Sequence, residues 1–289
     1  MKRVVFLSIL LLALAISTLL VPTTRVNAIT YGFIDSTNTY SNVGAFIVKS
    51  PTTGQIFPIC SGTMITQNVF LTAGHCAIFY TQDLAPSGFT AYVSLDGSIP
   101  FGSLTTNTTN LLAVSHVVTN PNYSQRQSDP GDIGVLILQN NVVGITPATL
   151  PNCNLLDQLS AQNGLKNAIF TPVGYGVQNR VVGGGVPFFQ DLNPVPRMFA
   201  FSSFNALNKG YIRLSQNPST GNGGTCFGDS GGPNFLNVNG QPILAAITIT
   251  GDSVCRATNV DYRTDTASAQ AFLTYVNATY GVSIPIPCS

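Results

Sequence analysis

The stretch GGTCFGDSGGPNF, residues 223–235, decides how the rest of the chain is interpreted. It places glycines on both sides of one acid and one serine, Asp229 and Ser230. Glycine allows backbone conformations and close approaches that side chains exclude, so a solvated turn would explain the glycines alone. A turn gives no reason for an aspartate directly before the serine. The question is whether Ser230 is a turn residue or a nucleophile.

A nucleophilic serine needs a histidine that takes its proton, and a third group that orients the histidine. The chain has two histidines. His75 ends an apolar segment in LTAGHCA, and a bridge between Cys60 and Cys76 would restrict the loop that carries it. His116 stands among apolar residues in LLAVSHVVTN, which is typical of a structural histidine. We therefore predict that His75 is the base for Ser230.

The orienting acid should lie at the edge of a buried element. DPGDIGVLIL, residues 129–138, places Asp132 immediately before an apolar strand. Asp129 precedes Pro130, a pairing typical of turns. We therefore predict Asp132, rather than Asp129, as the residue that orients His75.

Residues 228–232 also fit the pattern GxSxG of the nucleophile elbow in α/β-hydrolases. That architecture requires the chain order serine, acid, histidine. No histidine follows Ser230, so the elbow is excluded. The order His75, Asp132, Ser230 remains.

The chain opens with MKRVVFLSILLLALAISTLLVPTTRVNA, residues 1–28, which has the basic start, apolar run and small final residue of a secretory signal. A single membrane anchor is the alternative, because the apolar run is nearly long enough to span a bilayer. Removing the signal takes away Lys2, Arg3 and Arg25 and leaves 9 basic against 11 acidic residues. This balance offers no electrostatic footprint for nucleic acid or for an anionic membrane.

All six cysteines follow the signal, which favours disulfides, although six cysteines allow 15 connectivities. Neither histidine lies in a Cys/His cluster with zinc spacing. We therefore expect no metal and no cofactor.

Short apolar, β-branched segments recur between turn residues and predict an all-β fold. We expect strands at 44–49, 69–72, 90–95, 111–118, 133–138, 168–173, 197–204, 211–214, 243–250 and 257–262. A break at 146–167 divides them into a first β domain, 29–145, and a second, 168–265. A surface loop is expected at 181–196.

Residues 266–289 are expected to form a C-terminal helix and tail. Ala269, Phe272, Leu273 and Val276 share one face at helical spacing. Residues 264–266 provide N-cap side chains, and Gly281 provides a stop. We expect this helix to pack on the second domain.

The motifs TAGHC, DIGVLIL and GDSGGP, in this order, resemble those of the secreted serine peptidases of the chymotrypsin/trypsin family. The resemblance extends from Ile29 to the terminal helix. It implies two antiparallel six-stranded β-barrels of chymotrypsin type followed by a C-terminal helix. It also implies a triad in which Ser230 attacks the scissile carbonyl, His75 transfers the proton and Asp132 holds the imidazole. The backbone N–H groups of Gly228 and Ser230 would bind the oxyanion.

The resemblance implies further roles outside the triad. Asp229 would pair with a new N-terminal ammonium, and cleavage after Ala28 would expose Ile29 directly, without a separate zymogen step. A short propeptide, residues 23–28, is the alternative. The implied disulfides are Cys60–Cys76, Cys226–Cys255 and, by elimination, Cys153–Cys288.

The specificity pocket departs from the trypsin type. The family places the pocket floor six residues before the nucleophile, where an Asp selects Arg and Lys, and this chain has Gly224 there. Ile249, Thr250 and Gly251 would form the strand across the pocket. We expect an uncharged, apolar or small side chain at the cleaved position. Asp261 either reaches the floor or is structural.

These observations predict a secreted, extracellular serine endopeptidase that acts on protein or peptide substrates as a monomer through an acyl-enzyme. No nucleic acid partner and no stable membrane association are expected. A catalytically inactive, peptidase-fold binding protein is the alternative, and a different secreted hydrolase such as an esterase ranks third.

Overall fold

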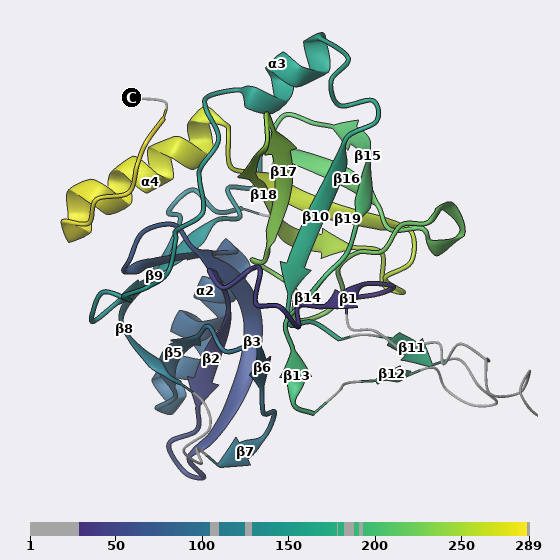
Figure 1. The fold of residues 1–289 in the computed structure, drawn as a ribbon. Helices are drawn as coiled ribbons and strands as arrows, with labels where there is room; N and C mark the ends of the chain where they lie inside the picture. Colours follow the sequence, from purple (N-terminus) through teal and green to yellow (C-terminus); the bar gives the residue numbers. More distant parts are fainter. Residues whose placement is uncertain are drawn as a thin grey trace, which may run out of the picture.

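Two β-barrels make up most of the fold, with a C-terminal helix beside them (Figure 1). The computed structural model describes residues 29–104, 110–124, 129–177, 179–181, 188–190 and 193–287. The predicted signal peptide, residues 1–28, lies outside the described residues, as do Cys288 and the centre of the expected surface loop.

The first barrel is a closed sheet in which every neighbouring pair is antiparallel. Its closure comes from the pairing of the first and last strands in the order, which register Val43 with Thr63. Around the barrel the strands are β2 (Val43–Lys49), β5 (Thr90–Ser94), β8 (Leu112–Thr119), β9 (Gly134–Leu138), β4 (Val69–Thr72) and β3 (Gln55–Met64), with β7 (Ser103–Leu104) added to β3.

The second barrel closes in the same way, by pairing of its first and last strands, which register Phe170 with Leu236. Around the barrel the strands are β10 (Ile169–Gly174), β15 (Ser202–Leu207), β16 (Tyr211–Ser215), β19 (Thr258–Arg263), β18 (Gln241–Gly251) and β17 (Pro233–Val238). The fold is therefore all-β, with two closed six-stranded antiparallel barrels, as predicted.

Short strands connect the barrels and the N-terminal segment. They are β1 (Phe33–Ile34) on β14 (Met198–Phe199), β14 on β10, and β13 (Val195–Pro196) on β6 (Ser98–Ile99). Part of the expected loop 181–196 is ordered, because β11 (Asn179–Val181) pairs with β12 (Phe188–Gln190) and β13 belongs to a ladder.

A buried ion pair fixes the N-terminal segment against both barrels. Arg197 Nε donates to Asp35 Oδ2 over 2.9 Å, and both side chains are 0 % exposed. The same guanidinium donates to the backbone oxygens of Val43 and Leu95 in the first barrel, at 3.1 and 3.0 Å, and to the hydroxyl of Tyr175 after β10, at 3.2 Å. One side chain thus joins three parts of the chain.

Three α-helices lie among the described residues: α2 (Gly74–Phe79), α3 (Leu155–Ala161) and α4 (Ala267–Tyr280). Single turns follow at Tyr80–Leu84, Ala85–Ser87 and Pro218–Thr220. The sequence predicted α4 and its signals: Thr266 Oγ1 accepts from the N–H of Ala269 at 3.1 Å, and Gly281 ends the helix with φ of +66°. It did not predict α2, or α3 within the segment 146–167.

Helix α4 shares an apolar cluster with residues of the second barrel, such as Leu244 and Tyr262, in line with the expected packing, but its contacts extend further. Its buried residues belong to one apolar cluster with strand residues of the first barrel, including Val69 and Val135. The ring of Tyr280 lies 5.1 Å from the ring of His116 on β8. The apolar face of α4 therefore also covers the first barrel, to which Figure 1 shows the helix adjacent.

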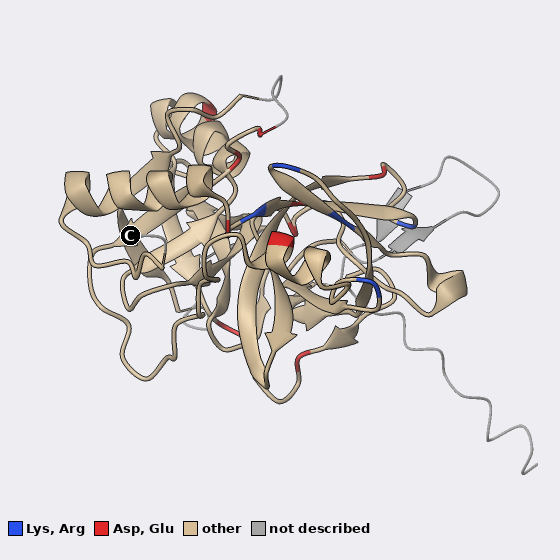
Figure 2. Cartoon of the chain, turned by 90° about the horizontal axis from the view of Figure 1, so that it is seen from above, with Lys and Arg blue, Asp and Glu red and all other residues tan. Residues whose placement is uncertain are grey.

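Charged residues are sparse along the described chain, as the few blue and red positions on the ribbon in Figure 2 show. Among the described residues, no helix is both long and apolar enough to cross a membrane.

Candidate active site

Pairing of two strands in the first barrel brings His75 to Asp132. Strand β4 and strand β9 are in register at Thr72 and Gly134, so the residues that follow one strand meet those that precede the other. The N–H of His75 donates to Asp132 Oδ1 over 2.8 Å, and its ring Nδ1 lies 3.0 Å from Oδ2. Asp132 is 6 % exposed. The carboxylate therefore contacts both the backbone and the ring of the histidine.

Ser230 lies in the loop before β17 and is held by the first barrel. The N–H of Ser61, on β3, donates to the backbone oxygen of Ser230 over 2.9 Å. Ser61 Oγ donates to the oxygen of Gly228 over 2.9 Å and accepts from the N–H of Tyr175 at 3.0 Å. Ser61 was not predicted from the sequence, where only its position after Cys60 could have indicated a role.

Ser230 and His75 line one pocket between the barrels, with a volume of about 270 Å³. Both residues are partly exposed. No hydrogen bond joins Ser230 Oγ to the His75 ring in the described part of the chain. Such bonds are often long in structures without substrate and shorten when substrate binds.

The backbone N–H groups of Gly228 and Ser230 are available to a ligand. Neither N–H group donates to an acceptor among the residues that the structure describes. Gly228 has φ of +95°, a conformation that favours glycine. A side chain at Gly231 would collide with Thr72 and Ser61. These glycines let the loop fold closely against the first barrel while two donors stay free.

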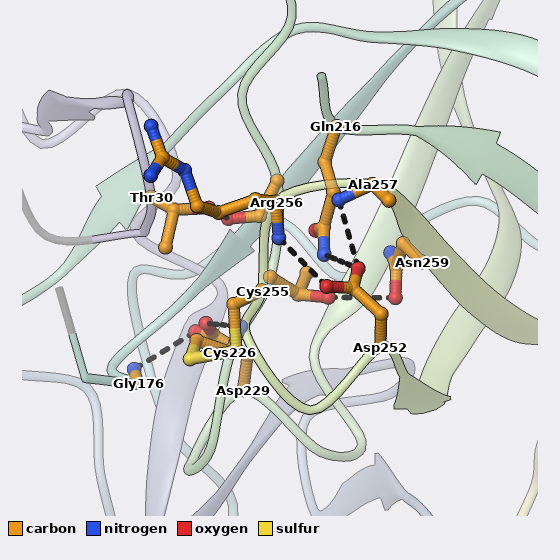
Figure 3. Close-up of a disulfide and its surroundings, with 12 residues drawn as sticks. Thr30, Gly176, Gln216, Cys226, Asp229, Asp252, Cys255, Arg256, Ala257 and Asn259 are labelled. Atoms are coloured by element: carbon orange, nitrogen blue, oxygen red, sulfur yellow. Dashed lines mark hydrogen bonds between the residues drawn. A yellow bond between two sulfur atoms is a disulfide. The ribbon is translucent and has the colours of Figure 1, made fainter. Parts of the chain in front are cut away.

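Asp229 points away from Ser230 into the protein and is 0 % exposed. Its oxygens accept from the N–H groups of Gly176, at 2.8 Å, and Cys226, at 2.9 Å (Figure 3). Burial raises the pKa of Asp229 to about 7, and the two backbone hydrogen bonds only partly oppose it. No cationic group pairs with it among the described residues.

The N-terminal segment lies close to this region. Ile29 is 0 % exposed and packs with Met198 and Ala200, and Thr30 forms an antiparallel bridge with Gly224. In the full chain the nitrogen of Ile29 is a peptide amide, not an ammonium.

Comparison with protein families matches residues 34–273 to the model described as Trypsin. The match covers more than half of the 289 residues. The chain belongs to the trypsin family. Trypsin-family membership supports, in general terms, a serine peptidase that acts on protein substrates.

The wall of the pocket in this trypsin-family chain includes the three residues predicted for it, Ile249, Thr250 and Gly251. Gly224, which was expected at the floor, is not among the residues that line this pocket. A Cβ at Gly224 would collide with the side chain of Gln216, so the amide of Gln216 occupies the space beside Gly224. Figure 3 shows Gln216 reaching from its strand end toward Asp252. The sequence analysis did not identify Gln216, because contact across a barrel leaves no local signal.

Two of the three expected disulfides lie among the described residues. Cys60–Cys76 joins β3 to α2, and Cys226–Cys255 joins two sides of the pocket. Cys288 lies outside the described residues, so the Cys153–Cys288 bridge stays a prediction.

Asp129 and His116, which were not chosen as catalytic residues, lie outside the pocket. Asp129 Oδ1 accepts from the N–H of Gly131 at 3.2 Å, as a turn residue does, and His116 lies away from the pocket against Tyr280. Cys60, His75 and Cys76 are close enough for a metal. The two sulfurs are bonded to each other, however, and are not thiolates, the form that binds metals.

Proposed function

We propose that this trypsin-family chain is a secreted, extracellular serine endopeptidase. The observation that carries the proposal is the contact of His75 with the buried Asp132 in the pocket that Ser230 lines. Ser230 attacks the scissile carbonyl, His75 takes its proton and later gives it to the leaving amine, and Asp132 holds the imidazole and stabilises its cation. The product of the first step is an acyl-enzyme that water hydrolyses.

The two free N–H groups at Gly228 and Ser230 fit the oxyanion of the tetrahedral intermediate. Donors that are fixed before the reaction stabilise charge as it develops, and one such donor contributes about 2.7–4 kcal/mol in comparable sites. Asp132→Asn is expected to lower kcat about 10⁴-fold, because the imidazole then takes the wrong tautomer.

We also propose that the mature chain begins at Ile29, after a signal peptide of residues 1–28. A buried carboxylate without a cation is costly, and Asp229 is such a group in the uncut chain. The φ angle of Ile29 is +48°, a conformation that is rare for a β-branched residue. This torsion exists only while Ile29 is bonded to residue 28. Cleavage there removes the strain and creates the ammonium that Asp229 lacks.

The proposed substrates are proteins or peptides, and the enzyme acts as a monomer without nucleic acid or a stable membrane contact. Gly224 provides no carboxylate for Arg or Lys, so the proposed specificity is not of the trypsin type.

Labelling with a fluorophosphonate probe tests the proposal, because the probe reacts with activated serines. The wild type and His116→Ala, the matched histidine control, should be labelled, whereas Ser230→Ala and His75→Ala should not. Cleavage of an internal peptide bond then separates a peptidase from an esterase. A wild type that begins at Ile29 and takes no label would refute the proposal in favour of the inactive binding protein. Sequencing the same sample tests the start at Ile29, which any other first residue contradicts.

A further inference from the structure

The hydroxyl groups of two threonines, Thr225 and Thr248, belong to the wall of the pocket beside Ser230. Thr225 Oγ1 donates to Asn259 Oδ1 over 2.6 Å. Thr248 Oγ1 accepts from Asn234 Nδ2 over 3.0 Å. The hydroxyl group of Thr225 therefore has lone pairs, rather than its proton, left for a ligand.

The carboxyl of Asp261 sets these orientations from behind the wall. Asn234 Nδ2 donates to Asp261 Oδ1 over 2.7 Å, so the amide oxygen of Asn234 faces the amide nitrogen of Asn259, 3.5 Å away. The oxygen of Asn259 consequently faces Thr225. A chain of side-chain amides thus transmits the orientation from a buried acid to the pocket surface.

Gln216 adds an acceptor directly behind the pocket: it is 0 % exposed and does not itself line the pocket, but its amide bonds to Asp252, which does. Its Nε2 donates to Asp252 Oδ1 over 3.1 Å, as Figure 3 shows, which fixes which end of the amide is the oxygen. Its Oε1 is buried and has no partner among the described residues, and it lies against Gly224. A buried acceptor without a donor costs free energy, and a substrate that brings a donor would remove that cost.

No carboxylate at the floor is placed to pair with a cation. Asp229 is held by backbone N–H groups, and Asp261 is 0 % exposed behind Thr248 and Asn234. Asp252 lines the pocket, but its oxygens already accept from Gln216 and three backbone N–H groups, so a cation there would compete with four donors. An ammonium or guanidinium would lose its hydration without a direct counter-ion.

We propose that the pocket selects an uncharged side chain that ends in hydrogen-bond donors, glutamine or asparagine, at the residue whose carbonyl is attacked. This inference rests on the proposed peptidase function. The earlier expectation, drawn from Gly224, was an uncharged, apolar or small side chain at the cleaved position. An apolar side chain of the substrate would leave acceptor oxygens unpaired, so we narrow the expectation to uncharged side chains that donate hydrogen bonds. Gln216 is the specificity-determining residue, and Asp261 is a positioning residue that acts through Asn234 and Asn259.

The test compares kcat/KM for peptide nitroanilides that differ only at the cleaved residue: Gln, Asn, Leu, Phe, Lys and Glu. Gln or Asn should exceed Leu, Phe and Lys by at least about tenfold. Gln216→Met keeps the length of the side chain but removes the acceptor, and it should reduce the Gln/Leu ratio about tenfold. Gln270→Met is the matched control, because Gln270 also has a buried Oε1 without a described partner and lies in α4, away from the pocket.

The outcomes separate the two proposals. If the protein is labelled by the fluorophosphonate but Leu, Phe or Lys is the best substrate, the pocket assignment is overturned and the peptidase function stands. If a chain that begins at Ile29 is not labelled, both proposals are overturned. If Gln216→Met does not fold, Thr225→Val provides the second variant, and an unchanged Gln/Leu ratio in it would also count against the assignment.

Discussion

Replacing Asp35 by Asn should destabilise the protein strongly, because Asp35 is the one acid that pairs with Arg197 among the described residues. Arg197 and Asp35 are both 0 % exposed, so water cannot replace the lost partner. The guanidinium keeps neutral acceptors, the oxygens of Val43 and Leu95 and the hydroxyl of Tyr175. A buried charge left without its partner costs about 3–5 kcal/mol.

For a chain of this size each kcal/mol corresponds to about 2–4 °C in Tm, so Asp35→Asn should lower Tm by about 6–20 °C in a thermal unfolding scan. Asp157→Asn is the matched control. Asp157 pairs with Arg263 but is 55 % exposed, and Arg263 keeps Asp265 at 2.9 Å. Its loss should cost less than about 1 kcal/mol. Equal changes in Tm for the two variants would refute the reasoning from burial.

Three further predictions concern other parts of the fold. In a chain that keeps the residues before Ile29, the pKa of Asp229 is raised to about 7. The stabilising contribution of Asp229 is therefore full below about pH 4 and declines as the pH rises toward 7. The variant Asp229→Asn should show a smaller decline of Tm over this pH range, and a decline as large as that of the wild type would contradict the prediction. Replacing Cys226 and Cys255 by Ser opens a bridge with a sequence separation of 29 and should cost about 3–4 kcal/mol in denaturant unfolding, whereas an unchanged midpoint would argue against a structural bridge. Thr266→Ala removes the N-cap of α4 and should cost about 1 kcal/mol, and Thr266→Ser should restore most of it.

The sequence predicted those features that local patterns encode. Apolar strands bounded by turn residues indicated nine of the extended segments, whereas the tenth, 197–204, is divided between β14 and the start of β15. The motif order predicted His75, Asp132 and Ser230 as one constellation. Strand β3 was missed because QIFPICSGTM has no regular alternation and contains proline and glycine. Strand β17 was missed because it begins with the proline of the glycine-rich motif.

Contacts between distant segments could not be predicted from the sequence. Ser61 bonds to Gly228 across 167 positions of sequence, and Gln216, at the end of β16, bonds to Thr258 on the paired strand β19 and to Asp252 beyond it. The side of α4 that would be covered and its packing on the second barrel were predicted, but its contact with the first barrel was not. An amphipathic pattern defines a buried face and does not identify its partner.

The position of α4 has a consequence for how the polypeptide is made. Ala269, Phe272 and Val276, near the end of the chain, cover apolar residues of a barrel whose strands end at Leu138. During synthesis from the N-terminus the first barrel is therefore translated long before its cover exists. We expect nascent chains that end before residue 266 to keep this apolar surface open to chaperones, and the final compaction to wait until the last residues emerge.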